Sequence, residues 1–289
     1  MRTCAWVAKG GAATAAVALA LVAGAALAAP AAERLVCVSK QINEFMFAIG
    51  AQDLIVARDL TSVYPPAITK IPSVGYHRAL SAEGILSAKP TTFLTDGNVG
   101  PDAVIGQVRQ VGIPVVVLRP GSTPDSAQAL LAELGRRYHR EAAAAKVLDE
   151  WRAAMRAVAK DSAAVKGPRP RVLFMHFGQI VNNYLGVKAG TPADRILRWA
   201  GGLNAIDSLG GMSRLTPESI ARLAPDVIIA TDVGFDRVGS AEKFAQLPGV
   251  ALTPAAKHMR IYRIDESEIM YFGPRTPAAV KHIAGMLRK

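Results

Sequence analysis

The hydrophobic positions of the chain form short runs that alternate with segments of helical spacing. Residues 34–38 and 54–57 are mainly apolar runs of strand length. Between them, residues 41–49 have apolar side chains at helical spacing and end at Gly50. Ser39 stands in the position of a helix cap directly after the first run. Strands that alternate with helices in this way predict an α/β fold.

Two segments about 135 residues apart share one pattern. In each, a Ser or Thr stands two positions before a Glu, an Ile two positions after it, and a Pro seven positions after it opens an apolar run. The segments are LSAEGILSAKPTTFL at residues 80–94 and LTPESIARLAPDVII at residues 215–229. Each predicts a capped short helix, with Glu83 or Glu218 in the first turn, and then a strand. Repetition at this separation indicates two homologous lobes rather than a solenoid.

A long helical segment separates the two repeats. Thr123 and Pro124 have the pattern of a helix start, and hardly a helix breaker except Gly135 follows before about residue 165. One unbroken helix here would be on the order of 60 Å long, and a bend near Gly135 stays open as an alternative. We therefore predict an N-terminal lobe over residues 33–122, a bridging helix over 123–166 and a C-terminal lobe over 167–289.

The first residues have the pattern of a secretory signal peptide. Arg2 and Lys9 precede an almost uncharged run that closes on Ala26-Leu27-Ala28, so we expect residues 1–28 to be cleaved. A membrane anchor is the alternative, but the run is rich in alanine and meets Pro30. No cysteine follows the small residues directly, as a lipoprotein signal requires. The mature protein is therefore expected to be exported and soluble.

Composition excludes several classes of protein and site. Cleavage would leave Cys37 alone, which excludes an intramolecular disulfide and a cysteine-based zinc site. Loss of the two cations Arg2 and Lys9 lowers the formal charge from +11 to +9, and a solvated basic face explains most of this excess. No phosphate-binding glycine loop, zinc-protease motif or serine-hydrolase motif occurs. We expect a monomer with no nucleic-acid partner.

Four stretches carry a resemblance to a known family. They are GYHRALSAEGILSAKPT, ADRILRWAGGLNA, LPGVALTPAAKHMRIYRID and FGPRTPAAV. With them, essentially the whole mature chain resembles the periplasmic binding proteins of ABC importers for haem, within the class that carries vitamin B12 and ferric siderophores. The paired glutamate segments are shared by the wider class. The sequence from Gly75 to Leu86 is similar to the haem branch.

The resemblance implies both a fold and a function. The fold is two Rossmann-like lobes joined by one long bridging helix, with a ligand cleft between them. The ligand is haem b, a cargo rather than a resident cofactor, and the protein is not an enzyme. It would work in the periplasm of a Gram-negative cell and deliver haem to the dimeric ABC permease of the inner membrane. Glu83 and Glu218, one on each lobe, would dock the permease.

Tyr76 is the candidate iron ligand. It lies between Gly75 and the next helix start, in a loop at the sheet edge where open α/β folds bind ligands. A phenolate prefers ferric iron, and tyrosine is a known type of haem ligand. A tyrosine phenol normally ionises near pH 10, so a neighbouring cation such as Arg78 would favour the anion. His77 is the local rival, but in an extended segment it should point away from the site if Tyr76 points in. The alternatives are that Tyr76 is an ordinary loop aromatic packed on the lobe and that Arg78 forms a salt bridge or contacts a haem propionate.

Other candidates come from the second lobe. His176 stands near the end of the predicted strand 171–175. Three roles are open for it: a second axial ligand, a neighbour of the haem that does not ligate the iron, or a structural histidine. Tyr184 and Arg237 are candidates to line the cleft or bind propionates, and Arg275 is expected to hold the fold. A ferric siderophore or corrinoid is the alternative ligand. A haem-degrading or peroxidase-like enzyme is disfavoured, because no acid/base group beyond His176 is recognisable.

Overall fold

The computed structural model describes residues 33–163, 166–177 and 184–289. The expected signal peptide lies outside these residues. No helix in the described ranges is long and apolar enough to cross a membrane. Residues 33–289 form one compact unit, so the predicted limits of the two lobes at residues 122 and 167 remain predictions.

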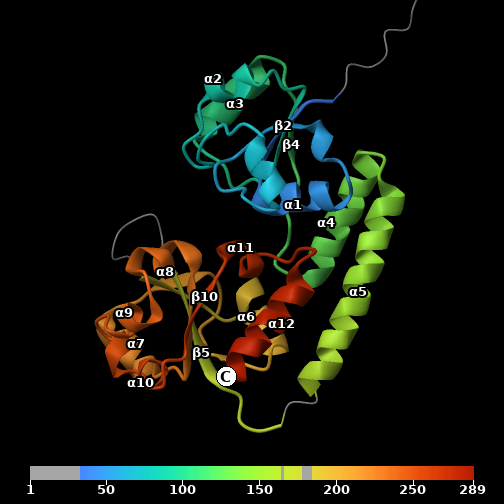
Figure 1. Cartoon of the computed structure of the whole chain (residues 1–289). Coiled ribbons are helices and arrows are strands. Elements are labelled where there is room, and N and C mark those ends of the chain that lie inside the picture. The colour runs from blue at the N-terminus through green and yellow to red at the C-terminus, as the bar shows by residue number, and fades with distance from the viewer. Residues whose placement is uncertain (1–32, 164–165, 178–183) are drawn as a thin grey trace, which may run out of the picture. The chain divides into compact units, whose positions relative to one another are not determined.

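The N-terminal part is built on a parallel four-stranded sheet in the order β2-β1-β3-β4 (Figure 1). Alternate side chains of β1 point to opposite faces. Val36 and Val38 pack with α2 and α3, whereas Leu35 and Cys37 pack with α1 and with α4 (Pro124–Arg137). The strands are β1 (Leu35–Val38), β2 (Ile55–Arg58), β3 (Thr92–Thr95) and β4 (Val115–Val117). The helices are α1 (Lys40–Ala48), α2 (Ala82–Ser87) and α3 (Asp102–Gln110), with 3-10 turns at Gln52–Leu54 and Pro66–Lys70.

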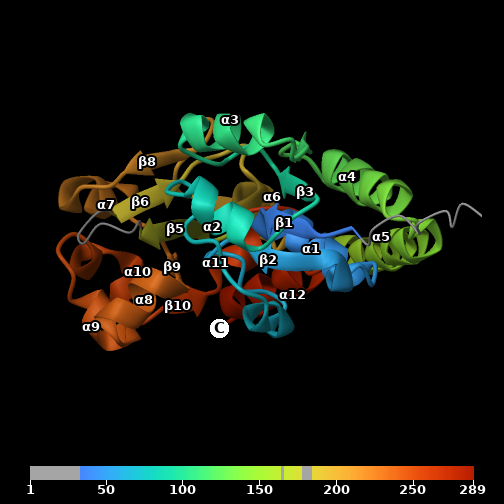
Figure 2. The same ribbon diagram turned by 90° about the horizontal axis from the view of Figure 1, so that it is seen from above.

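The C-terminal part has a mixed sheet in the order β10-β9-β5-β6-β8 (Figure 2). The short strand β7 also pairs with β5. The strands β10, β9 and β5 are parallel, and β6 and β8 run antiparallel at one edge. The strands are β5 (Arg171–Phe177), β6 (Tyr184–Val187), β7 (Leu203–Asn204), β8 (Met212–Arg214), β9 (Val227–Thr231) and β10 (Ile261–Ile264). The helices are α6 (Pro192–Trp199), α7 (Pro217–Leu223), α8 (Asp232–Val238), α9 (Ala241–Ala245), α10 (Pro254–Lys257), α11 (Glu266–Ile269) and α12 (Thr276–Leu287), with a 3-10 turn at Val250–Leu252. Two α/β lobes are therefore confirmed.

The repeated segments form the same unit in both lobes. The Ser81 hydroxyl accepts a hydrogen bond from the amide of Gly84 at 3.0 Å, and the Thr216 hydroxyl accepts one from the amide of Ser219 at 3.2 Å. These caps begin α2 and α7, whose central isoleucines are fully buried. Glu83 and Glu218 lie exposed in the first turns. The predicted helix and strand of each repeat are confirmed.

The prediction of one long bridging helix is wrong. Two helices, α4 (Pro124–Arg137) and α5 (Glu141–Ala163), lie side by side as a hairpin (Figure 1). The turn between them contains His139 at φ 53°, next to Tyr138, which is buried. Gly135 does not bend a helix here. A Cβ at this position would lie 2.6 Å from Cβ of Ala144, so the glycine lets the two helices approach closely.

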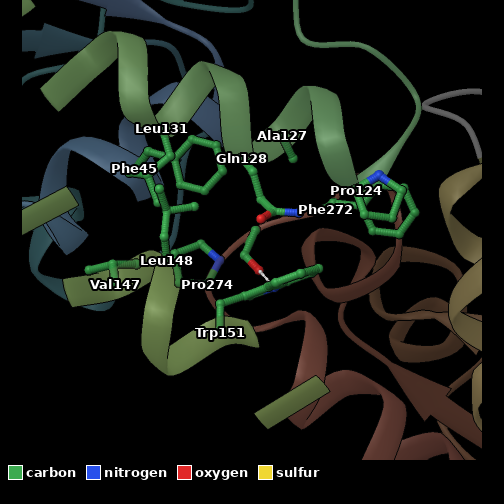
Figure 3. Close-up of a pocket in the computed structure, with 11 residues that line it drawn as sticks. Phe45, Pro124, Ala127, Gln128, Leu131, Val147, Leu148, Trp151, Phe272 and Pro274 are labelled. Carbon is green, nitrogen blue, oxygen red and sulfur yellow. Dashed lines mark hydrogen bonds between the residues drawn. The ribbon is translucent and has the colours of Figure 1, made fainter. Parts of the chain in front are cut away.

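One hydrophobic cluster connects the two sheets. It contains Leu35 and Cys37 of β1, Val172 and Phe174 of β5, and residues of α1, α4, α6 and α12. Figure 3 shows its edge, where Phe45, Leu131, Leu148, Trp151 and Phe272 line a small apolar pocket. The indole of Trp151 donates a hydrogen bond to the carbonyl of Gly273 at 3.1 Å. The lobes therefore share a core instead of meeting only through a linker.

A buried ion pair reinforces this junction. Glu44 of α1, only 3% exposed, accepts hydrogen bonds from Arg275 and from the hydroxyl of Tyr271, each at 2.9 Å. The Arg275 guanidinium also lies 3.5 Å from the ring centroid of Tyr64. Arg275 therefore joins the N-terminal helix to the segment before α12, in agreement with its expected role in holding the fold.

Replacing Arg275 by methionine is expected to lower the free energy of unfolding by about 3–5 kcal/mol, because the Glu44 carboxylate would stay buried without its cation. Urea denaturation of the purified protein measures this loss. The control is Arg136→Met, which breaks an exposed pair with Glu133 whose side chains are 62% and 39% exposed and is expected to cost at most about 1 kcal/mol. Equal, small losses in both variants would mean that the junction does not depend on this ion pair.

Candidate ligand-binding site

A wide cleft lies where the carboxyl ends of strands from both lobes meet. Its volume is about 640 Å³, within the range of about 300–1,000 Å³ for pockets that hold drug-sized ligands. The N-terminal lobe contributes the start of α1, the turn after β2, and the loops after β3 and β4. Its lining residues are Val38, Ser39, Lys40, Gln41, Asp59, Thr61, Tyr76, His77, Arg78, Asp96, Asn98, Pro120, Gly121 and Ser122. The C-terminal lobe contributes His176, Leu185, Pro192, Met212, Val233, Glu266, Met270 and Tyr271.

Tyr76, His77 and Arg78 all line this cleft. The expectation that His77 points away is wrong, because the segment is a turn and not an extended strand. The amide of Ala79 donates a hydrogen bond to the carbonyl of Tyr76 at 2.8 Å. The rings of Tyr76 and His77 lie 4.5 Å apart between centroids, tilted by 60°. Arg78 donates a hydrogen bond to the side-chain oxygen of Asn98 at 3.1 Å.

Thr61 links His77 to the buried carboxylate of Asp59. The Nδ1 atom of His77 lies 3.4 Å from the hydroxyl of Thr61, and this hydroxyl donates a hydrogen bond to Asp59. Asp59 is 1% exposed and also accepts hydrogen bonds from the Thr61 amide and the Ser62 hydroxyl. Burial lowers the pKa of His77 below its usual 6.5, although Asp59 opposes this shift. The imidazole is therefore neutral at neutral pH.

On the opposite wall, His176 lies near the end of β5 and its Nδ1 is 3.3 Å from the Thr231 hydroxyl. Burial lowers the pKa of this histidine as well. Between the walls, Lys40 of α1 and Glu266 of α11 form a 3.0 Å ion pair across the lobes. Neither residue was predicted from the sequence. Each lies two positions after the end of a strand, and this signal places a side chain at the ligand-binding edge of such sheets.

Tyr184 and Arg237 are not among the described residues that line the cleft. Tyr184 is on β6, half-buried against the core of the C-terminal lobe, and Arg237 is exposed on α8. Their predicted contact with haem propionates stays untested. No group of three or more His, Cys, Asp or Glu residues that could hold a bare metal ion occurs within the described ranges.

Comparison with known proteins identifies the family. Residues 35–268 match the model of the periplasmic binding proteins. The chain belongs to this family. It is thus a substrate-binding protein of an ABC importer and not an enzyme, and the resemblance found in the sequence is confirmed.

Individual relatives of this periplasmic binding protein cover most of its length. The periplasmic heme-binding protein RhuT from Roseiflexus sp. RS-1, in apo form, is 29% identical with a TM-score of 0.81, over 89% of this chain and 98% of that one. The periplasmic heme-binding protein BhuT, in complex with two hemes, is 31% identical with a TM-score of 0.80, over 88% and 97%. The ABC transporter substrate-binding lipoprotein YvrC of Bacillus subtilis (strain 168) is 22% identical over 254 residues, 87% of this chain and 79% of that one.

Proposed function

We propose that this protein binds haem b in the cleft, with Tyr76 as the axial iron ligand, and delivers it to an inner-membrane ABC permease. The observation that carries the proposal is the position of Tyr76 on the wall of a cleft large enough for a macrocycle. Its hydroxyl has no hydrogen-bond partner within the described ranges, so it is available to a ligand. The two heme-binding relatives support haem over other cargo of the class.

The neighbouring residues suit a phenolate ligand. A phenolate is a hard anionic donor that prefers ferric iron. Arg78 uses one donor on Asn98, and a guanidinium has five N–H donors, so others remain for the phenolate or for a carboxylate of the ligand. His176 faces the site from the other lobe, where it supports the haem as a second ligand or as a neighbour.

Delivery would use the outer surface of both lobes. Glu83 and Glu218 are exposed at equivalent places in the repeat, where they would meet basic residues on the two subunits of the permease. The protein would act as a monomer in the periplasm of a Gram-negative cell, after cleavage of residues 1–28.

The test is a titration of the purified protein with hemin, with a ferric siderophore complex and with a corrinoid, followed by visible spectroscopy. We expect saturable binding of hemin with the ferric charge-transfer bands of tyrosinate-ligated haem. A hemin titration without spectral change would remove the proposal. Saturable binding of the siderophore or the corrinoid in its place would establish the alternative cargo.

A further inference from the structure

The hydrogen bonds of Thr61 with His77 and with Asp59 determine which imidazole nitrogen of His77 carries the proton. The Thr61 hydroxyl has one hydrogen, which it donates to Oδ2 of Asp59. The Asp59 carboxylate accepts this hydrogen bond, as it accepts those from the Thr61 amide and the Ser62 hydroxyl. Toward His77, the Thr61 oxygen can therefore only accept, so Nδ1 is the ring nitrogen that carries a proton.

This leaves Nε2 of His77 with a free lone pair. The ring lines the cleft beside Tyr76, and Nε2 has no partner within the described ranges. Histidines that bind metals usually donate their other N–H in this way, because the bond fixes the tautomer and raises the basicity of the ligating nitrogen. His176 differs in this respect. Its neighbour Thr231 makes no second side-chain hydrogen bond in the described part of the chain, so the donor and acceptor in its contact with Nδ1 of His176 stay open.

We propose that His77 is a second iron ligand of the cleft and that it holds ferrous haem, whereas Tyr76 holds ferric haem. The inference rests on the proposed function. Neutral imidazole suits ferrous iron, and anionic phenolate suits ferric iron. A one-electron donor reduces the iron, and the phenolate leaves with its electron pair and takes a proton from water. The Nε2 lone pair of His77 then forms the new Fe–N bond, while the proton on Nδ1 stays in its bond to Thr61.

The ratio of ferrous to ferric affinity tests the assignment. Hemin is titrated into wild type, Tyr76→Phe and His77→Ala, as ferric hemin and, under anaerobic conditions, after reduction with dithionite. We expect the ratio to rise in Tyr76→Phe and to fall in His77→Ala. Resonance Raman spectra of the reduced wild type should contain an Fe–N(His) stretch that His77→Ala lacks. His176→Ala tests the rival histidine, and loss of that stretch in this variant instead would overturn the proposal.

A second pair of variants tests the hydrogen-bond relay without touching a ligand. Thr61→Val removes the acceptor for Nδ1–H at nearly constant shape, and loss of such a partner typically costs about 10–100-fold in metal affinity. The ferrous-to-ferric ratio should fall accordingly. Ser62→Ala is the matched control, because Ser62 also donates to Asp59 but makes no hydrogen bond to His77 within the described ranges. Melting curves check that both variants fold.

The outcomes separate this inference from the proposed function. If wild type binds no ferric hemin, the proposed function is wrong and this inference falls with it. If ferric binding is intact but His77→Ala keeps the wild-type ratio and Fe–N(His) stretch, only the role of His77 is wrong. Equal changes of the ferrous-to-ferric affinity ratio in Thr61→Val and Ser62→Ala would mean that Thr61 only stabilises the local structure and does not act through the nitrogen of His77.

Discussion

Replacing Tyr76 by phenylalanine is expected to remove the ferric charge-transfer bands of the hemin complex and to weaken ferric hemin binding by about a hundredfold or more. Loss of a residue that only supports a metal ligand already costs about 10–100-fold, and loss of the ligand itself should cost at least as much. The substitution deletes one hydroxyl that has no protein partner in the described ranges, so the free protein should keep its stability. Visible titration and thermal melting measure the two quantities.

The matched control for this prediction is Tyr262→Phe. Tyr262 lies on β10 of the C-terminal lobe and does not line the cleft, so the variant loses the same hydroxyl away from the site. It should bind hemin as wild type does. A Tyr76→Phe variant with the wild-type spectrum and affinity would contradict ligation by Tyr76, and His77 and His176 would then be the remaining candidates.

The parts of the fold that the sequence predicted correctly depend on local signals. Ser39 caps α1 by accepting from the amide of Ile42, and the capped helices of the repeat begin at Ser81 and Thr216 as expected. A cap, an apolar face and the following strand all lie within about 15 residues, so one stretch of sequence contains the whole unit. The presence of two such units was enough to predict two lobes.

The errors arose where distant contacts decide the local structure. Gly135 lies inside the last turn of α4, and no glycine or proline stands at the turn itself, where the chain reverses at Tyr138–Arg140 with Tyr138 buried in the core that connects the lobes. The orientation of His77 depends on a turn at residues 76–79 and on Thr61, which is 16 positions earlier. The ion pair of Lys40 with Glu266 spans 226 positions. Periodicity and propensity contain no information about such pairings.

Replacing both Glu83 and Glu218 by alanine is expected to abolish most haem delivery while hemin binding and melting temperature stay close to wild type. Both residues are exposed in the first turns of short helices, so neither is part of the core. The alternative is that they only stabilise the N-termini of their helices, where each carboxylate contributes about 0.3–1 kcal/mol to stability. If each instead meets a basic residue on one permease subunit, the two contacts act together on one body. Such bivalency can raise affinity about 10²–10⁴-fold over either contact alone.

Glu242→Ala separates docking from helix stabilisation. Glu242 is also exposed in the first turn of a short helix that is capped by a serine, but it lies outside the repeat. Hydrogen bonds at the helix start lower the pKa of both Glu218 and Glu242, so both are charged at neutral pH. Stimulation of the transporter ATPase in reconstituted vesicles should fall strongly in each single variant of Glu83 and Glu218, further in the double variant, and hardly at all in Glu242→Ala. Since all three losses remove one exposed carboxylate from a helix start, only specific contacts with the permease can produce this difference. Full stimulation by the double variant would contradict docking by Glu83 and Glu218, and the repeated segment would then serve only the fold.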